Sequence, residues 1–116
     1  SDLRDILKRY EQGDEEAILA VTLYTYRIKK YIGSYLAVIW EQLDAIIFTA
    51  GVGENSAIIR EKSLDNLSFY GFSIDQNKNE LKEKGIREIQ SGKTKILIVP
   101  TDEELEIAKQ AKELVD

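Results

Sequence analysis

AIIFTAGVGENS, from Ala45 to Ser56, is the stretch that decides the fold. Its first part, Ala45–Thr49, is short, apolar and rich in residues that favour strands, so it predicts a buried strand. A loop with two glycines follows, and a helix is expected over residues 56–64. The stretch therefore predicts a strand, a glycine loop and a helix in succession.

The end of the chain repeats this order. Lys95–Val99 predicts a second apolar strand, Pro100 stops it, and Thr101–Val115 predicts a helix with one apolar stripe. If the two strands are parallel neighbours, both loops emerge at the same edge of the sheet, where ligands bind in open α/β sheets. We therefore predict an α/β fold, a mixed sheet flanked by helices.

The remaining segments fit one domain over residues 1–116. A short helix is expected over 2–12, and Asp14 is expected to cap a long helix over 15–42, whose apolar residues lie on nearly all sides. Such a helix either crosses the centre of the domain or faces a partner chain. Further predictions are a packed loop or short strand (67–75), a charged helix (77–84) and a strand (87–90) that turns tightly into the strand at 95–99.

Composition excludes several classes of function. The net charge of −5 argues against a nucleic-acid surface, and no apolar stretch is long enough to span a membrane. Cysteine and histidine are absent, which removes thiolate chemistry and the commonest general base. We expect a cytoplasmic protein. Methionine is also absent and the chain opens on Ser1, so we expect a segment of a longer protein, with processing as the alternative.

The glycine loop is the first candidate site. Gly51 and Gly53 let a backbone approach a ligand closely, while Glu54 and Asn55 offer hydrogen bonds that suit a ribose or a base edge. The loop is neither a P-loop nor a complete dinucleotide fingerprint. The alternative is a tight turn that only connects strand and helix, with Asn55 or Ser56 as the N-cap.

Two further stretches carry candidate side chains. In the second loop, Thr101 and Glu104 can form a capping box, which leaves Asp102 and Glu103 freer to bind Mg²⁺. Near the N-terminus, Arg4 lies beside two acids, Asp2 and Asp5; it either makes a surface ion pair or contacts a phosphate or base.

Together these stretches resemble the acetate kinase family of the actin-like ATPase superfamily. The resemblance rests on Asp2-Leu3-Arg4-Asp5, on residues 48–56 and on residues 100–105, in order and at compatible separations. Ile59-Arg60, Gly71-Phe72 and Asp75 also fit, so the resemblance covers essentially the whole chain. Val52 departs conservatively from the isoleucine that is common there. The implied fold is the ribonuclease H-like C-terminal lobe of a longer enzyme.

The resemblance also implies a function, the reversible transfer of the γ-phosphoryl group of ATP to acetate. It implies that ATP or ADP contacts Asp2, Leu3, Arg4, Gly51, Val52, Gly53, Glu54 and Asn55, and that Glu103 binds Mg²⁺ (or Mn²⁺). A homodimer is implied, and the catalytic groups and acetate pocket lie upstream, so we expect the isolated chain to be inactive. The alternatives are a propionate kinase, or a non-catalytic module for nucleotide binding or dimerisation.

Overall fold

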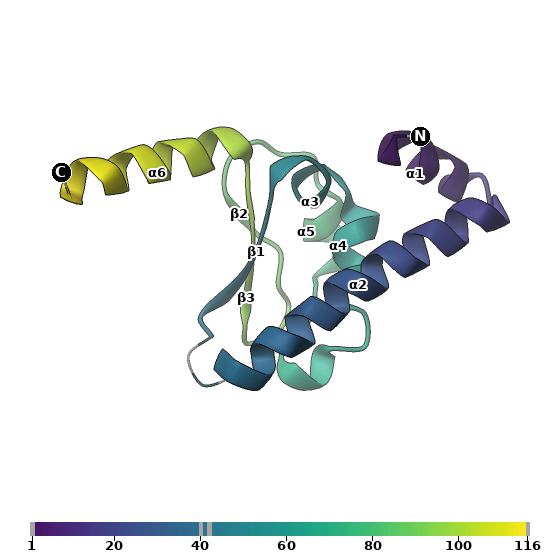
Figure 1. Ribbon diagram of the computed structural model, residues 1–116, viewed down its shortest axis with the longest axis horizontal. Helices are drawn as coiled ribbons and strands as arrows, with labels where there is room; N and C mark the ends of the chain where they lie inside the picture. The colour runs from purple at the N-terminus through teal and green to yellow at the C-terminus, as the bar shows by residue number, and fades with distance from the viewer. Residues whose placement is uncertain (1, 40, 42, 116) are drawn as a thin grey trace. The chain divides into compact units, whose positions relative to one another are not determined.

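The computed structural model describes residues 2–39, 41 and 43–115. The chain divides into two compact units, Ser1–Leu43 and Asp44–Asp116, and each has its own organisation (Figure 1). The expectation of one domain over the whole chain stays a prediction. The candidate residues near the N-terminus belong to the first unit, and both strand-to-helix connections belong to the second.

Both helices predicted for the first unit are observed in its described residues, α1 (Leu3–Glu11) and α2 (Glu15–Ile39). Asp2 caps α1 by accepting a hydrogen bond from the backbone N–H of Arg4. Between the helices Gly13 takes φ 82°, a left-handed conformation that glycine adopts without steric cost. The long helix ends at Ile39, and the predicted end at 42 lies outside the described residues.

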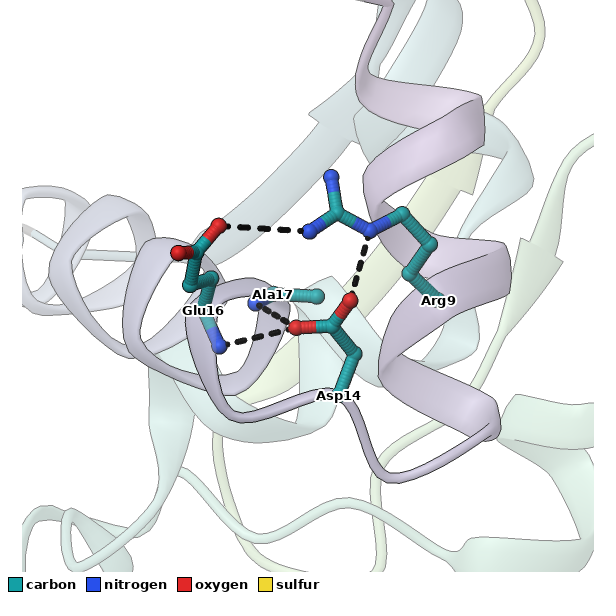
Figure 2. A network of polar contacts seen from close by, with 4 residues as sticks. All are labelled: Arg9, Asp14, Glu16 and Ala17. Atoms are coloured by element: carbon teal, nitrogen blue, oxygen red, sulfur yellow. Dashed lines mark hydrogen bonds and ion pairs between the residues drawn. The ribbon is translucent and has the colours of Figure 1, made fainter.

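Asp14 joins the two helices through its carboxylate (Figure 2). Its Oδ1 accepts hydrogen bonds from the backbone N–H of Glu16 at 2.9 Å and of Ala17 at 3.3 Å, as the predicted cap of α2 should. Its Oδ2 accepts from Nε of Arg9 in α1 at 2.8 Å. The Arg9 hydrogen bond, then those from the backbone, hold the pKa of Asp14 below its usual range. One ionised side chain therefore both starts α2 and ties it to α1.

The apolar surface of α2 is only partly covered. Ala17, Val21 and Thr25 are buried along one line of the helix. This chain does not bury α2 on all sides, because large apolar side chains elsewhere on the helix are exposed. These are Ile18, Leu19, Leu23, Tyr24, Tyr26, Tyr31, Tyr35, Val38 and Ile39.

The second unit is built on a sheet whose described strands lie in the order β1 (Ala45–Thr49), β3 (Lys95–Val99), β2 (Arg87–Glu88) (Figure 1). β1 and β3 are parallel and in full register, from Ala45 beside Lys95 to Thr49 beside Val99. β2 pairs antiparallel with β3. The predicted mixed sheet and the predicted parallel neighbours are therefore confirmed.

Helices and a short 3₁₀ turn connect and follow these strands. Ser56 caps the helix predicted over residues 56–64, and the charged helix ends at Glu80 rather than at 84. The ambiguous segment 67–75 contains the 3₁₀ turn and a single bridge from Ile74 to Gln90, which lies beyond the short β2. The elements are α3 (Ala50–Asn55), α4 (Ala57–Leu64), η2 (Ser68–Tyr70), α5 (Gln76–Glu80) and α6 (Thr101–Val115).

The core of this unit consists of apolar side chains from the sheet, α4 and the loop after η2. β1 is less buried than predicted: Phe48 lies in the core, but Ile47 is 56% exposed. The reason is that β1 is at an edge of the sheet among the described strands, while β3 is central. The buried apolar residues are Phe48, Ile59, Leu64, Phe72, Ile89, Ile96, Ile98 and Val99.

The last helix, α6, projects from the end of the sheet (Figure 1). Its predicted apolar stripe is not packed at Ala108 and Ala111, which are exposed; the other members, Leu105 and Val115, have side chains outside the description. Among the described helices, none has the length and apolar character needed to cross a membrane.

Candidate functional site

The two strand-to-helix connections meet at one edge of the sheet, as predicted. Thr49 and Val99 are paired at the ends of β1 and β3; α3 begins directly after Thr49, and α6 begins after Pro100 (Figure 1). α3 also contacts both β3 and α6. The parallel pairing of the strands therefore brings the glycine-rich connection beside the start of α6.

The residues 51–55, called the glycine segment below, form a kinked helical stretch rather than an open loop. Gly51 has φ 48° and ψ −104°, a conformation that side chains on L-residues rarely permit. A Cβ atom at Gly51 would meet nothing within 4 Å, so the space beside its backbone is open. The side-chain amide of Asn55 donates to the carbonyl oxygen of Gly51 at 2.8 Å and closes the segment on itself.

Ser56 ends the glycine segment and starts α4. Its backbone N–H donates to the carbonyl of Val52, and its Oγ accepts from the N–H of Ile59 at 3.2 Å. Of the two N-caps considered from the sequence, Ser56 is the one observed. Asn55 instead braces the segment from within.

Arg60 fixes the segment from the protein side. Its side chain is almost fully buried, and Nη1 donates to the carbonyl oxygens of Gly53 at 3.0 Å and Glu54 at 2.9 Å. Nε and Nη2 donate to Asn79, at 2.7 Å to the side-chain oxygen and 2.8 Å to the backbone carbonyl. Burial, with a smaller effect from the positive charge of Arg87, lowers the pKa of Arg60 to about 10, so it remains a cation at neutral pH.

Sequence reasoning did not find this role for Arg60, nor any role for Asn79. Arg60 follows two isoleucines in a helix, and its local pattern is that of an ordinary arginine on a partly apolar helix. Asn79 comes 19 residues later, inside a charged stretch. The pairing depends on how α4 and α5 pack, and no motif within either helix indicates it.

Glu54 connects the glycine segment to α6. Its Oε1 accepts hydrogen bonds from the backbone N–H of Thr101 at 2.9 Å and from the Thr101 hydroxyl at 3.0 Å. The predicted capping box has Thr101 pairing with Glu104, whose side chain lies outside the description. The structure adds a partner from the first connection, so a candidate ligand-binding carboxylate also holds the second connection in place.

Glu103, the predicted metal ligand, lies in the first turn of α6 and is exposed, as is Asp102. No group of three or more His, Cys, Asp or Glu side chains gathers in the part of the chain that the structure describes. Mg²⁺ is commonly held by one or two carboxylates with phosphate oxygens and waters. An exposed Glu103 fits a shared site of that kind, though not a cage made by this chain.

The third candidate group belongs to the first unit. Asp2 caps α1, and its Oδ2 also pairs with the Arg4 guanidinium at 2.9 Å. Hydrogen bonds from Arg4, first from its backbone and then from its side chain, hold the pKa of Asp2 below its usual range. Arg4 is 90% exposed. The surface ion pair weighed from the sequence is thus observed, and nucleotide contact by Asp2, Leu3 and Arg4 stays a prediction.

Comparison with known proteins gives a consistent family. The acetokinase family profile matches residues 1–109. The chain is 50% identical to an acetate kinase of Campylobacter lari over 115 residues, which is 99% of this chain and 29% of that protein. The crystal structure of Porphyromonas gingivalis acetate kinase matches 99% of this chain and 29% of its own, at 39% identity and a TM-score of 0.81.

A second solved structure adds a neighbouring activity. A propionate kinase from Francisella tularensis matches 92% of this chain and 27% of its own, at 36% identity and a TM-score of 0.78. The chain spans about three tenths of the length of the curated relatives it matches. The sequence similarity extends along nearly the whole chain and includes the glycine segment and the strands of the mixed α/β sheet. The chain therefore belongs to the acetokinase family.

Proposed function

We propose that the chain is the C-terminal part of an acetate kinase that reversibly transfers the γ-phosphoryl group of ATP to acetate, giving acetyl phosphate. Its own share is the binding of the adenosine part of ATP or ADP and part of a Mg²⁺ site. The observation that carries the proposal is the glycine segment. Space beside the Gly51 backbone is open, Arg60 holds the segment by hydrogen bonds, and the segment lies at the sheet edge where α/β folds bind ligands.

The side chains of the segment have the chemistry for a nucleoside. Glu54 uses Oε1 to hold Thr101, which leaves Oε2 as an acceptor for a ribose hydroxyl. Asn55 uses its amide nitrogen on Gly51, which leaves Oδ1 as an acceptor for a donor on the base or ribose. Gly51, Val52 and Gly53 contribute backbone at close range. For Asp2, Leu3 and Arg4, which belong to the first unit, nucleotide contact is proposed from the family resemblance alone.

Glu103 is the proposed ligand of Mg²⁺ or Mn²⁺. The bound ion would neutralise phosphate charge during phosphoryl transfer. Glu103 holds a negative charge in the first turn of α6, and Glu54 fixes the start of that helix through Thr101. The chain would thus present a carboxylate beside the nucleotide, while the groups that act on the transferred phosphoryl lie in the rest of the protein.

We further propose a cytoplasmic homodimer. The observation that supports the dimer is the set of large exposed apolar side chains on α2, which a second copy would remove from water. Sedimentation of the wild type against a variant with charged residues at Leu19 and Leu23 tests it. A monomer–dimer shift supports the proposal, and an unchanged monomeric wild type contradicts it.

A propionate kinase is the second candidate, favoured by the similarity to the Francisella tularensis enzyme. The choice depends on the pocket for the acyl group, which the family resemblance puts upstream. Steady-state assays of the longer protein with acetate and with propionate decide it. The alternative that involves no catalysis is a module for nucleotide binding or for dimerisation.

Calorimetric titration of the chain with ADP, with and without Mg²⁺, tests the nucleotide role. We expect binding that strengthens with Mg²⁺, and we expect Glu103→Gln to remove only the Mg²⁺-dependent gain. Gly53→Val should weaken binding because added side-chain atoms would crowd the segment. Absence of ADP binding in a folded chain would leave only a structural role.

An activity assay tests the division of labour. With ATP, acetate and Mg²⁺ the 116-residue chain should form no acetyl phosphate, because phosphoryl transfer depends on charge-stabilising groups that we place upstream. Formation of acetyl phosphate by the purified chain would contradict this assignment.

A further inference from the structure

We propose that Arg60 is a positioning residue for nucleotide binding: it holds the glycine segment in its binding shape without touching the ligand itself. This inference rests on the function proposed above. The observation behind it is that the Arg60 guanidinium donates hydrogen bonds both to the glycine segment and to Asn79.

The flat guanidinium suits this arrangement. Nη1 reaches two successive carbonyls, those of Gly53 and Glu54, and so fixes the orientation of the two peptide planes to which they belong. Nε and Nη2 point to Asn79, which makes the fork bidentate on that side. A lysine ammonium at this position keeps the charge but lacks the rigid fork, so it would not satisfy both sides at once.

Asn79 anchors the other end. It is buried, its backbone N–H donates to the carbonyl of Asp75, and its side-chain amide donates to the carbonyl of Ala57 at 2.9 Å. The amide thus bridges α5 and the start of α4, and the arginine is held against a fixed point. Movement of the glycine segment away from Arg60 would leave a buried cation with unsatisfied donors, which is costly.

The effect reaches beyond the segment through Glu54. Arg60 holds the backbone carbonyl of Glu54, and the side chain of the same residue accepts both hydrogen bonds from Thr101 at the start of α6. The first turn of α6 carries Glu103. One buried cation therefore sets the position of the adenosine-binding backbone and, one step further, of the helix with the proposed metal ligand.

The test compares Arg60→Lys with the unmodified chain and with Arg27→Lys, the same chemical change at an exposed arginine of α2. The readouts are ADP affinity by calorimetry and peptide-resolved hydrogen exchange over residues 51–55, both well below the unfolding temperature. Arg60→Lys should weaken ADP binding about tenfold, the size of one hydrogen bond to a charged group. It should also speed exchange in the segment, and Arg27→Lys should change neither.

The pair of readouts separates positioning from general stability. A purely structural role would lower the unfolding temperature and leave the affinity and exchange of the folded protein unchanged, which would overturn the inference. Asn79→Ala provides a second variant, because it removes one acceptor and keeps the arginine, so a smaller change in the same direction is expected. Loss of folding in both variants would assign Arg60 to the core alone and overturn the inference as well.

The outcomes also distinguish this inference from the proposed function. If the unmodified chain is folded and binds no ADP, the proposed function fails, and the nucleotide role of Arg60 fails with it. If the unmodified chain binds ADP and Arg60→Lys binds equally well with unchanged exchange, the proposed function stands and only the positioning role is wrong.

Discussion

The two connections that follow the parallel strands occupy equivalent places and are built differently. After β1 the chain makes a kinked turn at Gly51, is closed by Asn55, and reaches its own helix cap at Ser56. After β3 the chain passes Pro100 and enters α6 directly, with Glu54 of the first connection bonded to its first residue. The first connection is fixed by its own residues and by Arg60, and the second depends on the first.

This difference indicates which connection determines the shape of the site. The glycine segment is fixed by hydrogen bonds within itself and to buried Arg60, so its shape is independent of α6. The start of α6 is held by the carboxylate of Glu54. Changes in the first connection should therefore affect both, while changes in the second should stay local.

Gly51→Ala should have the largest effect. The backbone at φ 48° and ψ −104° would have to carry a Cβ, at a cost of about 1–3 kcal/mol or a change in the segment's shape. Urea unfolding measures the loss of stability, and ADP calorimetry measures the loss of affinity.

Gly53→Ala is the matched control. Its backbone does not have positive φ, and an added Cβ would lie 3.7 Å from Phe48, an ordinary contact. Alanine should leave the free energy of unfolding unchanged or raise it by up to about 1 kcal/mol. Equal losses of stability in the two variants would show that the kink at Gly51 has no special role.

Glu54→Ala should have the next largest effect. It removes the carboxylate that accepts both hydrogen bonds of Thr101, and the expected loss of stability is about 1–2 kcal/mol. Amide exchange at Thr101 should become faster, while Glu54→Gln, which keeps an oxygen acceptor, should show a smaller change. An unchanged exchange rate at Thr101 would mean that α6 does not depend on the first connection.

Ser56→Ala should cost about 1 kcal/mol, because it removes the cap of α4. Thr101→Ala should cost less, about 0.5 kcal/mol, because the Thr101 backbone N–H keeps its bond to Glu54. Chemical denaturation of both variants gives the comparison. The reverse order would contradict the view that α4 is capped by its own residue and α6 by a distant one.

The sequence predicts the frame of the second unit well because the signals are local. The apolar runs at Ala45–Thr49 and Lys95–Val99 have the observed bounds, and α6 begins and ends where predicted. Pro100 marks the end of one strand through its fixed φ and missing N–H. Such signals depend on a few neighbouring residues, so one sequence is enough to detect them.

The interior of the site could not be predicted in the same way. The contact of Arg60 with Asn79 spans 19 residues, and that of Glu54 with Thr101 spans 47. Both contacts depend on tertiary packing. The local sequence agrees equally well with a surface position for Arg60 and with a ligand-binding carboxylate at Glu54. The exposure of Ile47 likewise follows from the position of β1 in the sheet, which its apolar composition does not reveal.

The smallest predicted effect concerns Asp14, whose carboxylate caps α2 (Figure 2). Glu54 likewise accepts a hydrogen bond from the start of α6, but Asp14 directly precedes its helix and Glu54 is distant in the chain. Hydrogen bonds from Arg9, then from the backbone, lower the pKa of Asp14 in the folded chain below its ordinary value of 3.8. The ionised carboxylate therefore adds stability that is fully present above pH 3.8 and is lost as the pH falls through the lowered pKa.

Thermal unfolding between pH 2 and pH 6, taken as roughly the range in which carboxylates titrate, should reveal this contribution. The wild type should lose more stability on acidification than Asp14→Asn, because the asparagine at position 14 has no carboxylate to protonate. Equal slopes for wild type and Asp14→Asn would mean that ionisation of Asp14 adds no stability, so that the hydrogen bonds from Arg9 and from the backbone do not favour its charged form.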